Sequence, residues 1–196
     1  MSRPSLLKAA FFWYYIAMQK DIVKILKSGG IGVYPTDTLY GIVSSALSRT
    51  AVERIYRLKG RDENKPFIIL ISDIKDLRMF GVSVTKEQQK ILDSLWPGPV
   101  SIIFQTTKMP YLHRGQNSLA FRMPKSKKVL GFLKKTGPLV APSANPQGLQ
   151  PAQTIADAKR YFSHDVDFYV AGGRKQGKAS RVVRLEKNGT IVVLRK

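Results

Sequence analysis

Two kinds of hydrophobic pattern alternate along the chain from residue 21 onward. Short continuous runs of apolar and β-branched residues are typical of buried strands, whereas apolar residues that recur every three or four positions are typical of helices. The runs predict strands over residues 31–34, 67–71, 100–104, 119–122, 139–141, 181–185 and 191–194. The periodic segments predict helices over residues 21–27, 50–58, 85–96 and 125–135, and one more that begins after Thr154.

Capping and turn residues predict where several of these elements begin and how they are joined. A hydroxyl followed three residues later by Glu or Gln forms a capping box, so Thr50 with Glu53 and Thr85 with Gln88 predict two helix starts. Asn188-Gly189 between two β-branched runs predicts a hairpin. Helical crossovers together with a hairpin predict one α/β domain, whose twisted sheet mixes parallel and antiparallel strands and is flanked by helices.

The first nineteen residues differ from the rest. Residues 6–18 are apolar apart from Lys8, which is too short a run to span a bilayer as a helix. No convincing signal-peptide cleavage site follows. The segment is a helix packed on the domain, an interfacial anchor or an upstream extension with the natural start at Met18, and we favour the extension. We therefore expect an apolar extension over residues 1–19, a domain over residues 20–196 and no membrane partner.

Composition removes several classes of chemistry. The 196 residues include no cysteine and only two histidines. A disulfide framework, a cysteine zinc site, a thiol nucleophile and a multi-histidine metal centre are therefore excluded. A chain without cysteine is compatible with a reducing cytoplasm, which is where we expect this protein.

The charge is strongly positive: 33 Lys and Arg against 13 Asp and Glu, or +20. No Asp or Glu lies between Asp93 and Asp157, and the segment from Ala171 onward is again mostly basic. These stretches can hold neither a paired-carboxylate mechanism nor an all-protein magnesium cage. They are either a solvated basic face or a site for an anionic partner such as a nucleotide, a nucleic acid or a membrane surface.

One phosphate-loop pattern fails on inspection. Residues 172–178 match G-x-x-x-x-G-K, but the next residue is Ala179, which has no hydroxyl for magnesium. The loop also precedes a predicted strand, whereas a phosphate loop opens a helix. We expect a flexible basic lid here.

Two other segments carry candidate chemistry. In Lys59-Gly60-Arg61 two cations follow a helix, and they either clamp a polyphosphate or only favour the helix C-terminus. In residues 142–148 a buried strand runs into Ser143 and Asn145, at the strand end where ligands of α/β proteins bind. The alternative interpretation of residues 142–148 is a plain turn that binds no ligand.

Together these segments resemble the YrdC-like family, the threonylcarbamoyl-AMP synthases of TsaC type, in the short form without an extra C-terminal domain. The matching motifs, in order, are Gly32–Gly41 (GVYPTDTLYG), Lys59-Gly60-Arg61 with Pro66, Trp96–Pro99, Phe121–Pro124, Ala141–Asn145 with Gly148, Ser180–Val183 and Leu194-Arg195. The resemblance covers about residues 20–196 and implies a YrdC-like fold.

The resemblance implies that L-threonine, bicarbonate or CO2, and ATP give threonylcarbamoyl-AMP and pyrophosphate for tRNA modification, with downstream threonylcarbamoyl-transfer proteins as partners. Because the reactants are anionic, the protein must mainly neutralise and align charge. Mg²⁺ would be held through the phosphates of ATP, with no protein metal site. A basic domain that binds double-stranded RNA or tRNA without catalysis is the alternative.

The resemblance also implies residue roles. The catalytic residues would be Lys59, Arg61, Ser143 and Asn145. ATP would contact these four and also Lys65, Ser118, Ala141 and Arg195. Threonine would be bound by Thr38, Arg122 and Ser180, with Arg122 pairing its carboxylate.

Two departures from the family concern amino-acid specificity. Leu70 stands where some relatives carry a threonine-contacting histidine, and Arg181 stands where a threonine is common. We also expect that replacing Lys59 or Arg61 by Ala abolishes turnover and leaves thermal stability nearly unchanged.

Overall fold

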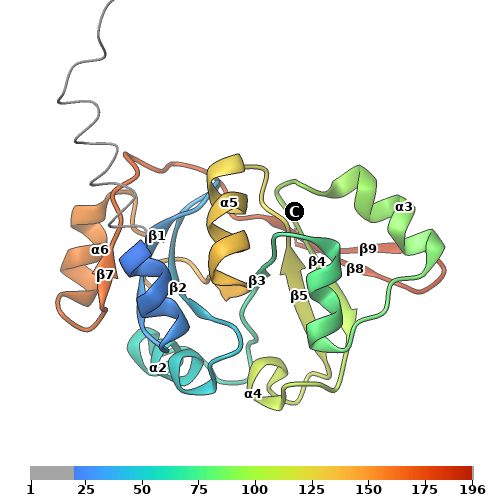
Figure 1. Cartoon of the computed structure of the whole chain (residues 1–196), viewed down its shortest axis with the longest axis horizontal. Coiled ribbons are helices and arrows are strands. Elements are labelled where there is room, and N and C mark those ends of the chain that lie inside the picture. Colours follow the sequence, from blue (N-terminus) through green and yellow to red (C-terminus); the bar gives the residue numbers. More distant parts are fainter. Residues whose placement is uncertain (1–19, 196) are drawn as a thin grey trace, which may run out of the picture.

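Nine strands join into one twisted sheet, in the order β7-β1-β2-β6-β3-β5-β4-β8-β9 (Figure 1). This computed structural model describes residues 20–195, so the predicted extension over residues 1–19 lies outside the described residues. The strands are β1 (Ile31–Pro35), β2 (Tyr40–Ser45), β3 (Ile69–Leu70), β4 (Val100–Gln105), β5 (Ser118–Arg122), β6 (Leu139–Val140), β7 (Phe168–Tyr169), β8 (Arg181–Leu185) and β9 (Ile191–Arg195).

The sheet is mixed, as predicted. Strands β7 and β1, β3 and β5, and β4 and β8 pair in parallel. The other neighbours, including the β1–β2 and β8–β9 hairpins, pair antiparallel. The predicted fold class is therefore confirmed, and β3 stands at the centre of the sheet.

Helices connect and cover these strands. Residues 20–27 are helical. The elements that follow are α2 (Arg49–Lys59), the 3-10 helix η1 (Ile74–Phe80), α3 (Lys86–Leu95), α4 (Pro110–His113), α5 (Lys127–Thr136) and α6 (Ile155–Phe162). None of the helices within residues 20–195 is long and apolar enough to cross a membrane.

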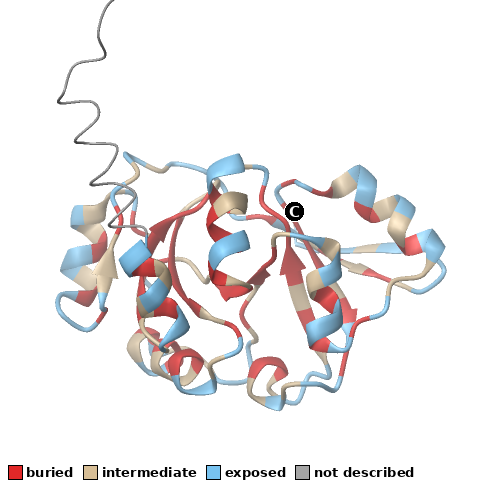
Figure 2. Cartoon of the chain, viewed as in Figure 1, coloured by how far each residue is buried: buried red, intermediate tan, exposed pale blue. Residues whose placement is uncertain are grey.

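Two hydrophobic clusters cover the two faces of the sheet. Neighbouring residues of a strand point to opposite faces, and Ile69 belongs to the larger cluster while Leu70 belongs to the smaller one. In the smaller cluster Phe132 of α5 stacks on Tyr34 of β1, with 4.2 Å between ring centroids. Figure 2 shows the buried strands between helices whose outer faces are exposed.

Local sequence signals succeed at some helix ends and fail at others. Thr85 and Thr154 cap α3 and α6 with complete capping boxes. The predicted box at Thr50 is wrong, because Ser48 caps α2 and Glu53 instead pairs with Arg114 at 2.7 Å. The strands also differ from the prediction in two places. The strand predicted over residues 67–71 is only Ile69–Leu70, and strand β2 was not predicted.

Candidate active site

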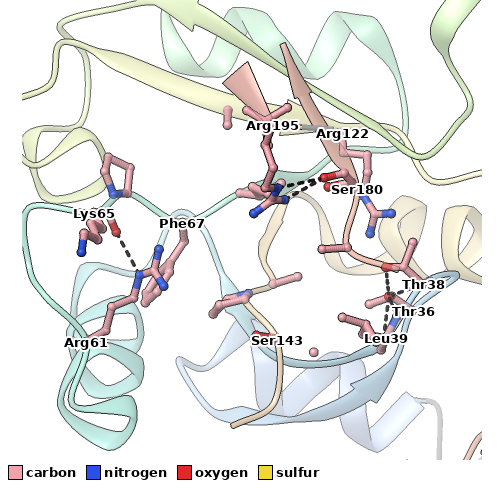
Figure 3. Close-up of a pocket in the computed structure, with 18 of the residues that line it drawn as sticks. Thr36, Thr38, Leu39, Arg61, Lys65, Phe67, Arg122, Ser143, Ser180 and Arg195 are labelled. Atoms are coloured by element: carbon pink, nitrogen blue, oxygen red, sulfur yellow. Dashed lines mark hydrogen bonds between the residues drawn. The ribbon is translucent and has the colours of Figure 1, made fainter. Parts of the chain in front are cut away.

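A cavity of about 540 Å³ opens where several separate stretches of the chain meet. Its wall is formed by the β1–β2 turn, the segment after α2, strands β4 and β5, the turn after β6 with Pro151, and both ends of the β8–β9 hairpin, where Ala179, Ser180, Val182 and Arg195 lie. Figure 3 shows residues from several of these stretches arranged around this space. The candidate site is therefore a product of the tertiary fold.

Strand β5 forms the floor of the cavity through its alternating pattern. Ser118, Ala120 and Arg122 line the cavity, whereas Leu119 and Phe121 point into the larger hydrophobic cluster on the opposite face. Small side chains at the first two positions leave room for a ligand. The same alternation places one buried arginine at the end of the strand.

Arg122 is held at the floor by an acidic residue of the β1–β2 turn. Its Nη1 lies 3.0 Å from Oδ1 of Asp37, and both side chains are nearly buried. Burial lowers the pKa of Arg122 below its usual value, and the carboxylate of Asp37 opposes this effect. Arg122 also lines the cavity, so it combines an ion pair with Asp37 and a position beside the space where a ligand carboxylate could bind.

A second arginine stands at the opposite side of the cavity. The Arg61 guanidinium lies 5.3 Å from the centroid of the Phe67 ring, and its Nε donates to the Lys65 carbonyl. Burial lowers the pKa of Arg61, and so does the positive charge of Arg195. Arg195 in turn donates to the carbonyl of Ser180 at 2.7 Å. Two guanidiniums that repel each other across one cavity favour an anion between them.

Lys59 lies behind the wall of this cavity, although it is only two residues from Arg61. It is the last residue of α2 and is 3% exposed. Gly60 takes the left-handed conformation with a φ of 57°, so the chain turns before Arg61. The Lys59 ammonium donates to the Ser143 carbonyl at 2.6 Å and also to the Asn145 carbonyl. Burial, followed by the charge of Arg61, lowers the pKa of Lys59 to about 7.

The turn after β6 also places its two predicted residues differently, one in the cavity wall and one behind it. Ser143 lines the cavity, whereas Asn145 is buried behind it. The Asn145 side chain donates to the carbonyls of Pro146 and Leu149 at 2.8 and 2.7 Å. Lys59 and Asn145 thus support the turn that presents Ser143, and their predicted contacts with ATP remain predictions.

Hydroxyl groups complete the wall near Arg122. Thr36 Oγ1 donates to the Leu39 carbonyl at 2.7 Å and lies 3.2 Å from Thr38 Oγ1, which fixes the turn (Figure 3). Ser180 Oγ lies 2.8 Å from Ser101 Oγ. The predicted residues that line the cavity are Thr38, Arg61, Lys65, Ser118, Arg122, Ala141, Ser143, Ser180 and Arg195.

Two contributors were not assigned a role from the sequence. Asp37 stands in the Gly32–Gly41 motif, at the β1–β2 turn. It is the only acidic residue of that motif, so it could have been suspected as the partner of a buried arginine. Phe67 was assigned to a strand, yet it stacks on Tyr56 and supports Arg61. No local pattern distinguishes such an aromatic residue from a core residue.

Leu70 and Arg181, the two departures noted in the sequence, do not line the cavity. Leu70 is buried in the smaller cluster, on the face of β3 opposite Ile69. Arg181 is exposed between Ser180 and Val182, which both line the cavity. Any effect of these two residues on specificity must therefore act through their neighbours.

The basic segment over residues 172–178 packs against the β1–β2 hairpin. The Tyr40 hydroxyl donates to the Gly173 carbonyl at 2.7 Å and accepts from the Gly172 amide at 2.8 Å. A Cβ at Gly177 would lie 2.3 Å from the Thr38 carbonyl oxygen, so only glycine fits there. Within residues 20–195 no group of three His, Asp or Glu side chains is placed to hold a metal ion.

Comparison with known proteins gives consistent matches. The Sua5, YciO and YrdC family model, described as telomere recombination, matches residues 24–196. The threonylcarbamoyl-AMP synthase of Hahella chejuensis is 30% identical over 176 residues, which are 88% of this chain and 95% of that protein. The threonylcarbamoyl-AMP synthase of Bacillus subtilis is 31% identical over 152 residues, which are 76% of this chain and 43% of that protein.

Solved structures agree with these matches. The crystal structure of P. abyssi Sua5 complexed with L-threonine aligns with a TM-score of 0.83 and 26% identity. The alignment covers 90% of this chain and 53% of that one. The chain thus spans about half the length of the B. subtilis and P. abyssi proteins.

Proposed function

Because this chain belongs to the Sua5, YciO and YrdC family, we propose that it is an L-threonylcarbamoyladenylate synthase. It would convert L-threonine, bicarbonate or CO2, and ATP into threonylcarbamoyl-AMP and pyrophosphate. Relatives named for this activity match most of the chain.

The charge of the cavity carries this proposal. Arg61, Lys65, Arg122 and Arg195 line it, and its described lining includes no Asp or Glu. Two of these cations have acidic partners outside the lining: Arg122 is paired with Asp37, and Lys65 is paired with Asp62. A site of this kind binds several anions together, which is what the joining of a carbamate and a triphosphate requires.

The reaction can be followed through these residues. The threonine amine attacks CO2 and loses a proton, which gives a carbamate. A carbamate oxygen then attacks the α-phosphorus of ATP, the bond to the β-phosphate oxygen breaks, and pyrophosphate leaves. Arg122 would pair the threonine carboxylate, with the Thr38 and Ser180 hydroxyls beside it. Holding the amine and the phosphorus together lowers the entropic part of the barrier.

The nucleotide would occupy the opposite side of the cavity. Arg61, Lys65 and Arg195 would neutralise the phosphates, and charge on the leaving pyrophosphate would be stabilised in the same way. Ser118, Ala141 and Ser143 would line the nucleotide. Lys59 and Asn145 would act by holding the Ser143 turn.

Magnesium would enter with ATP. The polar side chains that line the cavity are hydroxyls, amides and cations without a carboxylate, which suit a metal ion carried by phosphates and water and do not form a protein-held magnesium site. Mg²⁺ supplies charge neutralisation of the phosphates when it is bound.

The remaining partners follow from the chemistry. The product is an activated intermediate, so downstream threonylcarbamoyl-transfer proteins would consume it in the modification of tRNA. Direct binding of tRNA or double-stranded RNA would use the basic surface, and the cytoplasm is the proposed location.

Pyrophosphate release tests the proposal. We expect release from ATP only when threonine and bicarbonate are both present, and loss of release in Arg61→Ala. Release that needs neither co-substrate would contradict it. A protein that releases no pyrophosphate but binds double-stranded RNA, with affinity falling steeply as salt increases, would be the binding module instead.

A further inference from the structure

The basic segment between β7 and β8 has no part in the proposed chemistry, although it adjoins the cavity. Residues 171–179, which we name the strap, contain no helix or strand. The strap passes beside the β1–β2 turn and ends at Ala179, which lines the cavity next to Ser180. Because the strap has no regular backbone hydrogen bonds of its own, its position depends on its contacts with neighbouring elements.

Three hydrogen bonds between described residues hold the backbone of the strap. The Tyr40 hydroxyl makes two of them: it donates to the Gly173 carbonyl at 2.7 Å and accepts from the Gly172 amide at 2.8 Å. In the third, the Lys175 amide donates to the Gln153 carbonyl at 2.8 Å. One hydroxyl group therefore makes most of the backbone hydrogen bonds that hold the strap.

Tyr40 itself has a fixed position in the fold. It is the first residue of β2, opposite Pro35, and is 1% exposed in the larger hydrophobic cluster. Its carbonyl accepts from the Ala144 amide at 2.8 Å. A buried hydroxyl needs hydrogen-bond partners, and both partners of this hydroxyl belong to the strap. Tyr40 thus connects the strap to the core of the sheet.

The strap lies directly against β1 and the turn that carries Thr38. A Cβ at Gly172 would lie 2.3 Å from Cβ of Pro35, and a Cβ at Gly177 would lie 2.3 Å from the Thr38 carbonyl oxygen. Only glycine permits contacts as close as these. Three residues after Gly177 the chain reaches Ser180, so the strap connects the turn that carries Thr38 with Ser180.

Thr38 and Ser180 stand on the side of the cavity where threonine would bind. Figure 3 shows both residues on the side of Arg122, away from Arg61 and Lys65. A displacement of about 1 Å in a group that positions a substrate is enough to slow a reaction substantially. The position of the strap therefore affects the threonine side of the cavity more than the nucleotide side.

We propose that Tyr40 is a positioning residue for threonine: its hydroxyl holds the strap against the β1–β2 turn and thereby sets the spacing of Thr38 and Ser180. This inference rests on the proposed function. Tyr40 also lines the cavity, but its hydroxyl already donates to the strap and accepts from it. Tyr40 therefore acts through Thr38 and Ser180, without a hydrogen bond of its own to threonine.

Limited proteolysis tests whether the hydroxyl holds the strap. Tyr40→Phe keeps the buried ring and removes the hydroxyl. Trypsin cleavage after Arg174, Lys175 and Lys178 is followed by mass spectrometry in the full chain without substrates. We expect cleavage of the variant to be about tenfold faster than that of the wild type, because two hydrogen bonds no longer oppose local opening of the strap.

Tyr111→Phe is the matched control for loss of a tyrosine hydroxyl. The Tyr111 hydroxyl donates to the Ala46 carbonyl at 2.8 Å, and neither residue belongs to the strap or lines the cavity. This variant should leave cleavage of the strap at the wild-type rate. Thermal unfolding of both variants verifies that each is folded.

Pyrophosphate release tests the role in threonine binding, with threonine and ATP varied in turn. Tyr40→Phe should raise KM for threonine about fivefold and leave KM for ATP within about twofold of the wild type, whereas Tyr111→Phe should change neither value. A merely structural role would lower the fraction of active protein, and hence kcat, without separating the two KM values.

Cleavage of Tyr40→Phe at the wild-type rate would overturn the proposal, and so would faster cleavage with an unchanged KM for threonine or an equal rise in both KM values. Threonine affinity is also measured by calorimetry without ATP, which separates this proposal from the proposed function. A wild-type chain that binds threonine and releases no pyrophosphate would refute the synthase activity alone. A rise of about fivefold in the Kd of Tyr40→Phe for threonine would then still support the positioning role, and an unchanged Kd would overturn it.

Discussion

Replacing Lys59 by Ala should reduce both stability and activity, which changes the expectation drawn from the sequence. A cation at the end of a helix would normally be exposed, and its loss would then cost little stability. Here the side chain is 3% exposed and its ammonium holds the carbonyls of Ser143 and Asn145. The variant removes a support that lies inside the protein.

The size of the loss can be worked from these contacts. The Ser143 carbonyl keeps the Asn145 amide as a donor at 3.0 Å, so the Asn145 carbonyl is the more affected group. An unsatisfied buried acceptor costs about 1–3 kcal/mol. Losing three buried methylenes costs about 2 kcal/mol more. Removing a desolvated charge offsets part of this, which leaves a net loss of about 2–3 kcal/mol.

Thermal unfolding and pyrophosphate release measure the two effects together. For a domain of this size the loss corresponds to a decrease in Tm of about 4–12 °C. Arg61→Ala is the matched control: it should abolish pyrophosphate release and leave Tm within about 2 °C. A Tm for Lys59→Ala equal to that of the wild type would refute the supporting role and restore Lys59 as a cavity residue.

Three further outcomes follow from the same geometry. Asp37→Asn leaves the buried Arg122 without its partner, so we expect a loss of about 3 kcal/mol in urea unfolding and an altered KM for threonine with little change in KM for ATP. Gly177→Ala places a Cβ against the Thr38 carbonyl and should raise KM for threonine several-fold; an unchanged KM in steady-state assays would contradict this close packing. Burial lowers the pKa of Lys59 to about 7 from 10.5, so the unfolded chain binds more protons between these values and the free energy of unfolding should rise with pH across that window. Urea unfolding at pH 7 and 9 should show a gain of about 2 kcal/mol that Lys59→Met lacks; equal gains would place the titration elsewhere.

Elements with strong local signals could be predicted from the sequence. Thr85 and Thr154 each have a capping partner three residues on, and both cap helices in the structure. Ser48 and Thr50 are both able to cap α2, and the position of the helix on the sheet decides between them. Strand β2 includes Gly41 and has no clear pattern of its own, so its pairing with β1 and β6 is a tertiary effect.

The site was predicted in outline because its residues sit at the ends of strands and helices. Nine of the predicted residues line one cavity, including Arg61, Arg122 and Arg195. The sequence could not separate Lys59 from Arg61, because the left-handed turn at Gly60 sends the two cations to different sides of one wall. The Asp37 partner of Arg122 also depends on a contact across 85 positions.

The wall of the cavity that contains Arg122 extends along the chain from Thr36 to Arg195, so its two ends are joined only after β1 and β9 have both taken their places. During synthesis, Arg195 is the last residue of the cavity wall to be added to the growing polypeptide. Loop closure over such distances is slow compared with helix formation. Because Arg195 belongs to this wall, ligand binding in a refolding experiment would report that β9 is in place, and a peptide carrying β9 could be tested for rescue of a chain truncated before Ile191.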